Sequence, residues 1–210
     1  MGRNTDIRKE ATTEEAILAA AEKLFIKKGF ALTSTTEIAR QAGCNQALVH
    51  YYFRTKEQLF VSIFSKKLHH FATKLIDIYT PGIPFEDMVC KMVDAHFDIL
   101  EENPQLPTLI INELMTNPER IRTLREGMSE LAARLYTRVA ADMHAGIVAG
   151  RIREMEPEDL FMDLLSLDAF PFLARPIIKG TFGLDDAGFG KFLKRRREMV
   201  KKILINNIRP

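Results

Sequence analysis

Apolar residues recur every three or four positions along nearly the whole chain, which is the spacing of helices with one buried face. The first such stripe predicts a helix over about 13–28 that opens at a capping box between Thr12 and Glu15. Proline and glycine residues divide the rest of the chain into separate predicted helices. Further helices are predicted over about 35–42, 46–52, 56–79, 85–102, 106–115, 118–149, a proline-interrupted stretch from 157, and 191–207. No segment predicts a strand, so the expected fold is all-α with about nine helices.

Residues 34–60 have the layout of a helix-turn-helix. Ser34 and Glu37 are spaced as a capping box that opens a short helix. Gly43 ends this helix, as glycine does just past a helix terminus. Asn45 is a good cap for a second short helix. In a helix-turn-helix the second helix enters the major groove of DNA, so this segment predicts a sequence-specific DNA-binding protein.

The second short helix has one apolar face and one polar face. Val49 and Phe53 are four positions apart, so they share a face and should anchor the helix to the core. Gln46, Ala47 and His50 then lie on the other face, where DNA would be met. The glutamine amide can pair with N6 and N7 of adenine, and an alanine methyl can touch the methyl group of thymine.

Composition narrows the class of protein further. The net charge is +2, but residues 1–56 carry nine Lys or Arg and six Asp or Glu, which suits phosphate contacts. No apolar run is long enough to span a membrane and the first ten residues are polar, so we expect a cytoplasmic protein without a membrane partner. Two cysteines favour reduced thiols over a disulfide framework. No paired metal-ligand spacing or catalytic motif occurs, so we expect no metal site, no cofactor and no enzyme activity.

The segment from Ile17 to about Phe64 resembles the DNA-binding domain of the tetracycline-repressor (TetR) family. The matching elements are Ala20-Ala21-x-x-Leu24-Phe25-x-x-x-Gly29-Phe30, Thr35-x-x-Ile38-Ala39-x-x-Ala42-Gly43 and His50-Tyr51-Tyr52-Phe53-x-x-Lys56-x-x-Leu59. Cys44 stands where the family usually has an aliphatic residue, and His50 where tyrosine is commoner.

This resemblance implies a division of the chain and a set of DNA contacts. A three-helix DNA-binding domain would cover 1–56, and a larger helical effector-binding and dimerisation domain 57–210, with the helix from residue 56 linking them. Gln46 would read a base, while His50 would reach a base edge or a phosphate. Residues at phosphate-holding positions set register without reading sequence. The candidate DNA-binding residues are Thr35, Asn45, Gln46, Ala47, His50, Tyr51, Tyr52 and Lys56.

Polar residues inside apolar stripes of the larger domain are candidates for effector binding. His96 interrupts the apolar face of the 85–102 helix beside Met92, Glu113 lies in an apolar segment, and Asp168 lies in another. Polar groups in apolar surroundings need partners, and a ligand is one possible partner. A hydrogen bond inside the protein is the commoner solution for any one residue, and the sequence leaves both open.

The function expected from the resemblance is a homodimeric transcriptional regulator that represses from a double-stranded DNA operator and is released by a small-molecule effector of unknown identity. Dimerisation is expected through the two C-terminal helices, with apolar stripes that include Leu160, Leu164, Leu167, Phe192, Met199 and Ile203. The basic run 194–197 is interpreted as the solvated face of the last helix. The alternative is a nucleoid or scaffold protein that keeps the DNA-binding head but answers to a protein partner.

Overall fold

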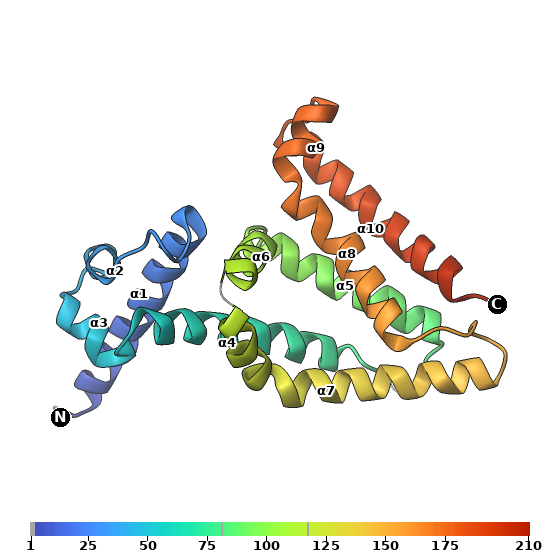
Figure 1. Ribbon diagram of the computed structural model, residues 1–210, viewed down its shortest axis with the longest axis horizontal. Coiled ribbons are helices and arrows are strands. Elements are labelled where there is room, and N and C mark those ends of the chain that lie inside the picture. Colours follow the sequence, from blue (N-terminus) through green and yellow to red (C-terminus); the bar gives the residue numbers. More distant parts are fainter. Residues whose placement is uncertain (1–2, 81, 117) are drawn as a thin grey trace. The chain divides into compact units, whose positions relative to one another are not determined.

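Ten helices and the short segments between them account for the described part of the chain, which in this computed structural model is residues 3–80, 82–116 and 118–210. The helices are α1 Arg3–Lys28, α2 Thr35–Ala42, α3 Gln46–Phe53, α4 Lys56–Asp77, α5 Phe85–Glu102, α6 Leu106–Thr116, α7 Pro118–Val148, α8 Pro157–Leu173, α9 Arg175–Phe182 and α10 Asp186–Ile208 (Figure 1). The all-α prediction is confirmed over these residues.

Two predicted helix starts are wrong. α1 begins at Arg3 rather than near Thr13, because the polar segment before the apolar stripe has no proline or glycine to stop a helix, so Thr12 is not a cap. α10 begins at Asp186 rather than near Lys191. Asp185 is its N-cap and accepts a hydrogen bond from the Gly188 N–H at 2.6 Å, and such a cap favours helix even in a glycine-rich segment.

The described chain divides into two compact units, which are treated separately below. Unit 1 comprises residues 1–68 and 109–127, and unit 2 comprises 69–108 and 128–210. α4 contributes its first part to unit 1 and its last part to unit 2.

Unit 1 is held by aromatic packing between α1, the segment after it and α4. The Phe25 and Phe60 rings lie 5.5 Å apart and meet edge to face, and the Phe30 ring lies 5.3 Å from Phe60. Such pairs contribute beyond the area that they bury. Val49 and Phe53 of α3 are buried in the same unit, as their spacing predicted. The packing therefore fixes which face of α3 points outward.

Unit 2 is built around α5, α8 and α10, which pack against one another (Figure 1). Their buried residues join those of α7 in one apolar cluster. Leu160 and Leu164 are fully buried in this cluster, so their assignment to a dimer face is wrong. The α8 segment carries apolar residues on more than one face, and the sequence did not show which of them the core of the subunit covers.

Candidate nucleic-acid interface and effector site

The turn between α2 and α3 is fixed by three local devices. Ser34 and Glu37 make the predicted capping box, with both reciprocal hydrogen bonds present. Gly43 has φ +70°, a left-handed conformation that favours glycine, and its N–H bonds to carbonyls of α2. Asn45 Oδ1 accepts from the Leu48 N–H at 2.9 Å and caps α3. The orientation of α3 is therefore set by side chains close to it in sequence.

The outward face of α3 carries the predicted base-reading residues. Gln46, Ala47 and His50 are exposed, and Tyr51 is 72% exposed. Tyr52 is half-buried and packs edge to face against the Tyr51 ring, 5.2 Å away. This arrangement exposes polar and aromatic groups on one face of α3, while the opposite face is anchored in the core.

A hydrogen-bond network joins α2 and α3 on this outward face. Gln46 Nε2 lies 3.0 Å from Thr35 Oγ1 and 3.4 Å from His50 Nε2, and Gln46 Oε1 lies 3.2 Å from Thr36 Oγ1. His50 Nδ1 lies 3.1 Å from the carbonyl oxygen of Arg54. Thr36 was not among the predicted site residues, because nothing in the sequence spacing shows that two helices meet at its hydroxyl.

Lys56 is engaged inside unit 1. Its Nζ donates to the carbonyl oxygens of Phe30 at 2.9 Å and Thr33 at 2.8 Å, and lies 4.2 Å from the centroid of the Phe30 ring. The sequence predicted a phosphate contact here and gave no sign of this second role. An ammonium group has three protons, and two of them are used inside unit 1.

Arg54 is a further residue that sequence reasoning missed. It ends α3 with φ +34° and ψ −46°, a conformation that costs a residue with a Cβ atom some strain. On either side of Arg54, the Thr55 N–H donates a hydrogen bond to the carbonyl oxygen of Phe53. Thr55 Oγ1 accepts a hydrogen bond from the Gln58 N–H at 3.1 Å and so caps α4. The sharp reversal lets α4 start directly after α3.

In unit 2 the structure brings together two of the predicted effector residues. His96 of α5 and Asp168 of α8 are buried, and His96 Nδ1 lies 3.0 Å from Asp168 Oδ2. Asp168 Oδ1 has no hydrogen-bond partner among the described residues. Burial raises the pKa of the Asp168 carboxyl, although the hydrogen bond from His96 opposes this rise. Met92 is buried on α5, and the side chain of Glu113 lies outside the described residues.

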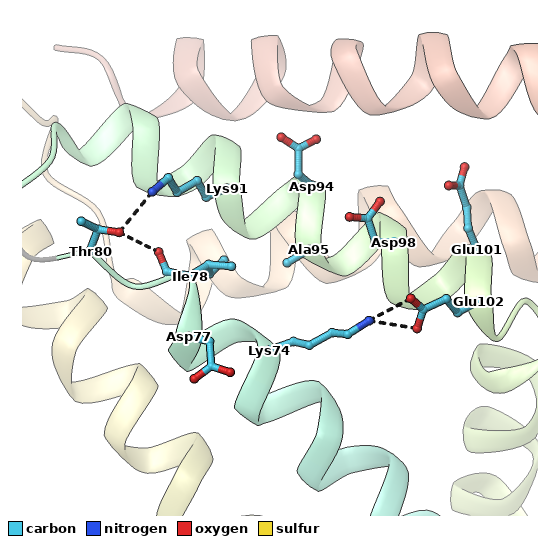
Figure 2. A pocket seen from close by; sticks show the side chains of 10 residues that line it. All are labelled: Lys74, Asp77, Ile78, Thr80, Lys91, Asp94, Ala95, Asp98, Glu101 and Glu102. Atoms are coloured by element: carbon cyan, nitrogen blue, oxygen red, sulfur yellow. Dashed lines mark hydrogen bonds and ion pairs between the residues drawn. The ribbon is translucent and has the colours of Figure 1, made fainter.

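A pocket of about 850 Å³ lies on another face of α5, beside the end of α4 (Figure 2). It does not include Met92, His96 or Asp168. Most of its lining residues are charged or polar, and Figure 2 shows Lys74 paired with Glu102 and Lys91 bonded to Thr80. The lining residues are Lys74, Asp77, Ile78, Thr80, Lys91, Asp94, Ala95, Asp98, Glu101 and Glu102.

The acidic wall of this pocket is tied to α10 by ion pairs. Arg197 Nη2 lies 2.8 Å from Asp98 Oδ1 and 3.0 Å from Glu101 Oε2, and Lys201 Nζ lies 2.7 Å from Asp94 Oδ1. The Arg197 side chain is only 20% exposed. Its assignment to a solvated basic face is therefore wrong, because its guanidinium joins α10 to α5, whereas Lys194 and Arg195 are exposed as expected.

Unit 2 also exposes large apolar side chains on its last three helices. A soluble protein rarely leaves contiguous apolar surface uncovered. Leu167 and Phe192, predicted for the dimer face, are half-buried against the core. The exposed side chains are Met162, Leu165, Phe170, Ile177, Phe182, Met199 and Ile203.

Within residues 3–80, 82–116 and 118–210, histidine, cysteine and carboxylate side chains do not form a group of three that could hold a metal ion. Across those ranges no helix combines the length and apolar character that crossing a bilayer demands.

A capped helix-turn-helix with an exposed polar face on its second helix, followed by a separate helical unit, defines a helix-turn-helix DNA-binding protein. The particular family follows from comparison with known proteins. Residues 17–63 match the model described as bacterial regulatory proteins of the tetR family, and residues 86–203 match the tetracyclin repressor-like C-terminal domain. The chain belongs to the TetR family and is a DNA-binding transcriptional regulator.

Individual relatives are similar over parts of the chain. The transcriptional repressor Rv3405c of Mycobacterium tuberculosis is 37% identical over 46% of this chain and 50% of its own length. The fatty acid metabolism regulator protein of Bacillus subtilis is 22% identical over 66% of this chain and 70% of its own. The crystal structure of FadR from Bacillus subtilis in complex with stearoyl-CoA has the same fold, with a TM-score of 0.67 and 20% sequence identity. The match covers 92% of this chain and 98% of the FadR chain. These relatives favour a regulator over a nucleoid or scaffold protein.

Proposed function

We propose that this regulator is a homodimeric repressor that a small molecule releases from its operator. It acts in the cytoplasm, by binding rather than by catalysis. Three observations support the proposal: an outward polar face on α3, uncovered apolar side chains on α8 to α10, and a buried carboxylate with an unsatisfied oxygen in unit 2. The first of these carries the DNA-binding role most directly.

On the DNA side, Gln46 and Ala47 read base edges from the major groove, and His50 contacts the Gln46 amide beside them. The residues around them hold the backbone, because phosphate contacts fix register and carry no sequence information. Tyr51 is exposed at the end of the reading face, and Lys56 keeps one proton for a phosphate. The complete set of backbone-contacting residues is Thr35, Asn45, Tyr51, Tyr52 and Lys56.

Dimerisation follows from what one reading helix can achieve. A single helix-turn-helix reads few base pairs, and a two-fold dimer places two reading helices about 34–36 Å apart on successive turns of the groove. The apolar side chains that unit 2 leaves exposed on α8, α9 and α10 provide the surface for such an interface. Met199 and Ile203 of α10 are the members of the predicted stripe that remain available.

On the effector side, we assign the polar anchor to the His96–Asp168 pair, with Met92 nearby on α5. Leaving a buried acceptor without a donor costs about 1–3 kcal/mol. A ligand that donates a hydrogen bond to Asp168 Oδ1 recovers this cost. The relative FadR was crystallised with stearoyl-CoA, so a long apolar body is a reasonable first choice for the rest of the ligand. Glu113 is kept as a candidate from its place in the sequence.

The test begins with selection of bound duplexes from random DNA, which identifies the operator. A reporter gene behind that operator should be silenced by the protein. Fluorescence anisotropy then follows release of the labelled operator as acyl-CoA thioesters, free fatty acids and apolar amines or alcohols are added. A reporter that the protein activates contradicts the proposed repression. An operator complex that none of these classes of small molecule dissociates contradicts the proposed release by an effector.

A further inference from the structure

We propose that Thr35, Thr36 and His50 fix the amide of Gln46 so that it offers DNA a hydrogen-bond acceptor and no donor. Gln46 then makes one hydrogen bond, through Oε1, to an amino group on a base edge, either N6 of adenine or N4 of cytosine. This inference rests on the proposed role of Gln46 as a base reader. It assigns Thr35, Thr36 and His50 as positioning residues that decide base preference.

The first step is the protonation pattern of the His50 ring. Nδ1 lies 3.1 Å from the carbonyl oxygen of Arg54, and a carbonyl oxygen only accepts hydrogen bonds. Nδ1 must therefore carry the proton. A neutral imidazole has one proton on its two ring nitrogens, so His50 Nε2 is left as an acceptor on the side that faces Gln46.

The second step counts the hydrogens of the Gln46 amide. Nε2 has two, and two acceptors lie beside it: Thr35 Oγ1 at 3.0 Å and His50 Nε2 at 3.4 Å. Oε1 accepts from the Thr36 hydroxyl at 3.2 Å. A carbonyl oxygen can accept two hydrogen bonds. The capacity left to Gln46 is therefore one acceptor site on Oε1, while both donors are used inside the protein.

The third step concerns the opposite orientation of the amide. Turning Gln46 over would place Oε1 against His50 Nε2, so that two acceptors would face each other without a proton between them. The position of the proton on His50 thus selects the orientation of the amide. Because the ring is in turn held by the Arg54 carbonyl, the selection extends to the strained residue that ends α3.

This differs from the two-bond contact with adenine N6 and N7 that the sequence alone suggested for Gln46. In that contact the amide must donate to N7 as well as accept from N6. Here the donor is already committed to Thr35 and His50, so N7 should be dispensable. The inference therefore makes a prediction at the level of single atoms of the base.

The experiment uses the full-length protein and the operator obtained by selection. The base pair whose identity becomes irrelevant in Gln46→Ala is the pair that Gln46 reads, and its base with a major-groove amino group is either adenine or cytosine. If this base is adenine, it is replaced in turn by 7-deazaadenine, which lacks N7, and by purine, which lacks the N6 amino group. We expect a change of less than about twofold in Kd for 7-deazaadenine and a loss of about tenfold for purine. If it is cytosine, 2-pyrimidinone, which lacks N4, should give the same loss.

A double variant releases the amide and provides the second arm. Thr35→Val with His50→Phe removes both acceptors of the Gln46 amide and keeps a branched and a planar aromatic side chain at the two positions. Its binding should become sensitive to 7-deazaadenine, with a loss of about fivefold or more, because Gln46 can then donate to N7. His69→Phe is the matched control, since His69 is exposed on α4 and lies outside unit 1. It should bind both duplexes as the wild type does.

Several results would overturn the inference. These are a wild type that loses tenfold on 7-deazaadenine, a double variant that remains insensitive to it, and, where the pair is G·C, binding that 2-pyrimidinone leaves unchanged. If Gln46→Ala leaves every base preference unchanged, the proposed reading role of Gln46 fails instead. The two failures are therefore distinguishable.

Discussion

Replacing Lys56 with methionine should weaken the fold of unit 1 as well as DNA binding. The Lys56 ammonium donates to the carbonyls of Phe30 and Thr33 and lies over the Phe30 ring. Methionine keeps most of the apolar stem and removes the charge. Both carbonyls belong to the segment between α1 and α2, so the change should loosen the support of the helix-turn-helix.

The magnitude follows from these contacts. A hydrogen bond from a charged group contributes about 1.5–3 kcal/mol, and because Lys56 is half-buried the two bonds together should fall near the lower end of their sum. An ammonium over an aromatic ring adds about 0.5–1 kcal/mol. We expect a loss of about 3–4 kcal/mol in the free energy of unfolding, with Tm lower by roughly 6–16 °C.

Circular dichroism melts of Lys56→Met and of the control Lys66→Met would measure this loss. Lys66 is exposed on α4, so its variant removes a charge from the surface. Operator affinity at several salt concentrations tests the second role. If Lys56 also holds a phosphate, Lys56→Met should reduce the slope of log K against log salt by about 1. A Lys56→Met protein that melts with the Lys66→Met control would refute the structural role.

Three further changes test the other assignments. Gln46→Ala should weaken the cognate operator by about 1–3 kcal/mol and relax one base position, and an equal loss on a scrambled duplex would contradict base reading. Met199, which is 50% exposed, should lie in the dimer interface, so Met199→Glu should sediment as a monomer at micromolar concentration; a dimer would place the interface elsewhere. Burial holds the pKa of Asp168 above its ordinary value of 3.8, so the charged form destabilises the fold. The resulting loss in the free energy of unfolding is absent below pH 3.8, where the carboxyl is protonated in both states. It is complete above the raised pKa, where the carboxyl is charged in both states. Asp168→Asn should therefore gain about 1–3 kcal/mol at pH 8, a gain that shrinks toward pH 4 in thermal melts; a gain that grows as the pH falls would reverse the assigned sign.

The DNA-binding part of unit 1 was largely predictable because its determinants are local. The Ser34 box, the left-handed Gly43 and the Asn45 cap are each read from residues within three or four positions. They place both ends of the turn, and the spacing of Val49 and Phe53 then orients α3. What the sequence could not give is the contact between helices, such as that of Thr36 with Gln46, because it depends on packing.

Unit 2 shows where periodicity stops being informative. The stripe on α8 is apolar on more than one side, so Leu164 was indistinguishable from a residue of an interface, although it is buried in the core. Arg197 lies in a basic run that looks solvated, yet three carboxylates on α5 surround it. The pairing of His96 with Asp168 spans 72 residues, and only the assembled fold brings the two helices together.

The unsatisfied oxygen of Asp168 bears on how an effector could change DNA binding. An effector shifts a conformational equilibrium only by its difference in affinity for the two states. Asp168 Oδ1 is enclosed in the present state, so a ligand donor can reach it only if α8 moves locally from α5, and the ligand then favours the moved state. The cost recovered is about 1–3 kcal/mol, which is the usual size of coupling between two sites and corresponds to about 5–150-fold in affinity. If Asp168 supplies that coupling, Asp168→Asn should bind the operator as tightly as the wild type but lose most of its release by effector. An unchanged release would assign the coupling to another group.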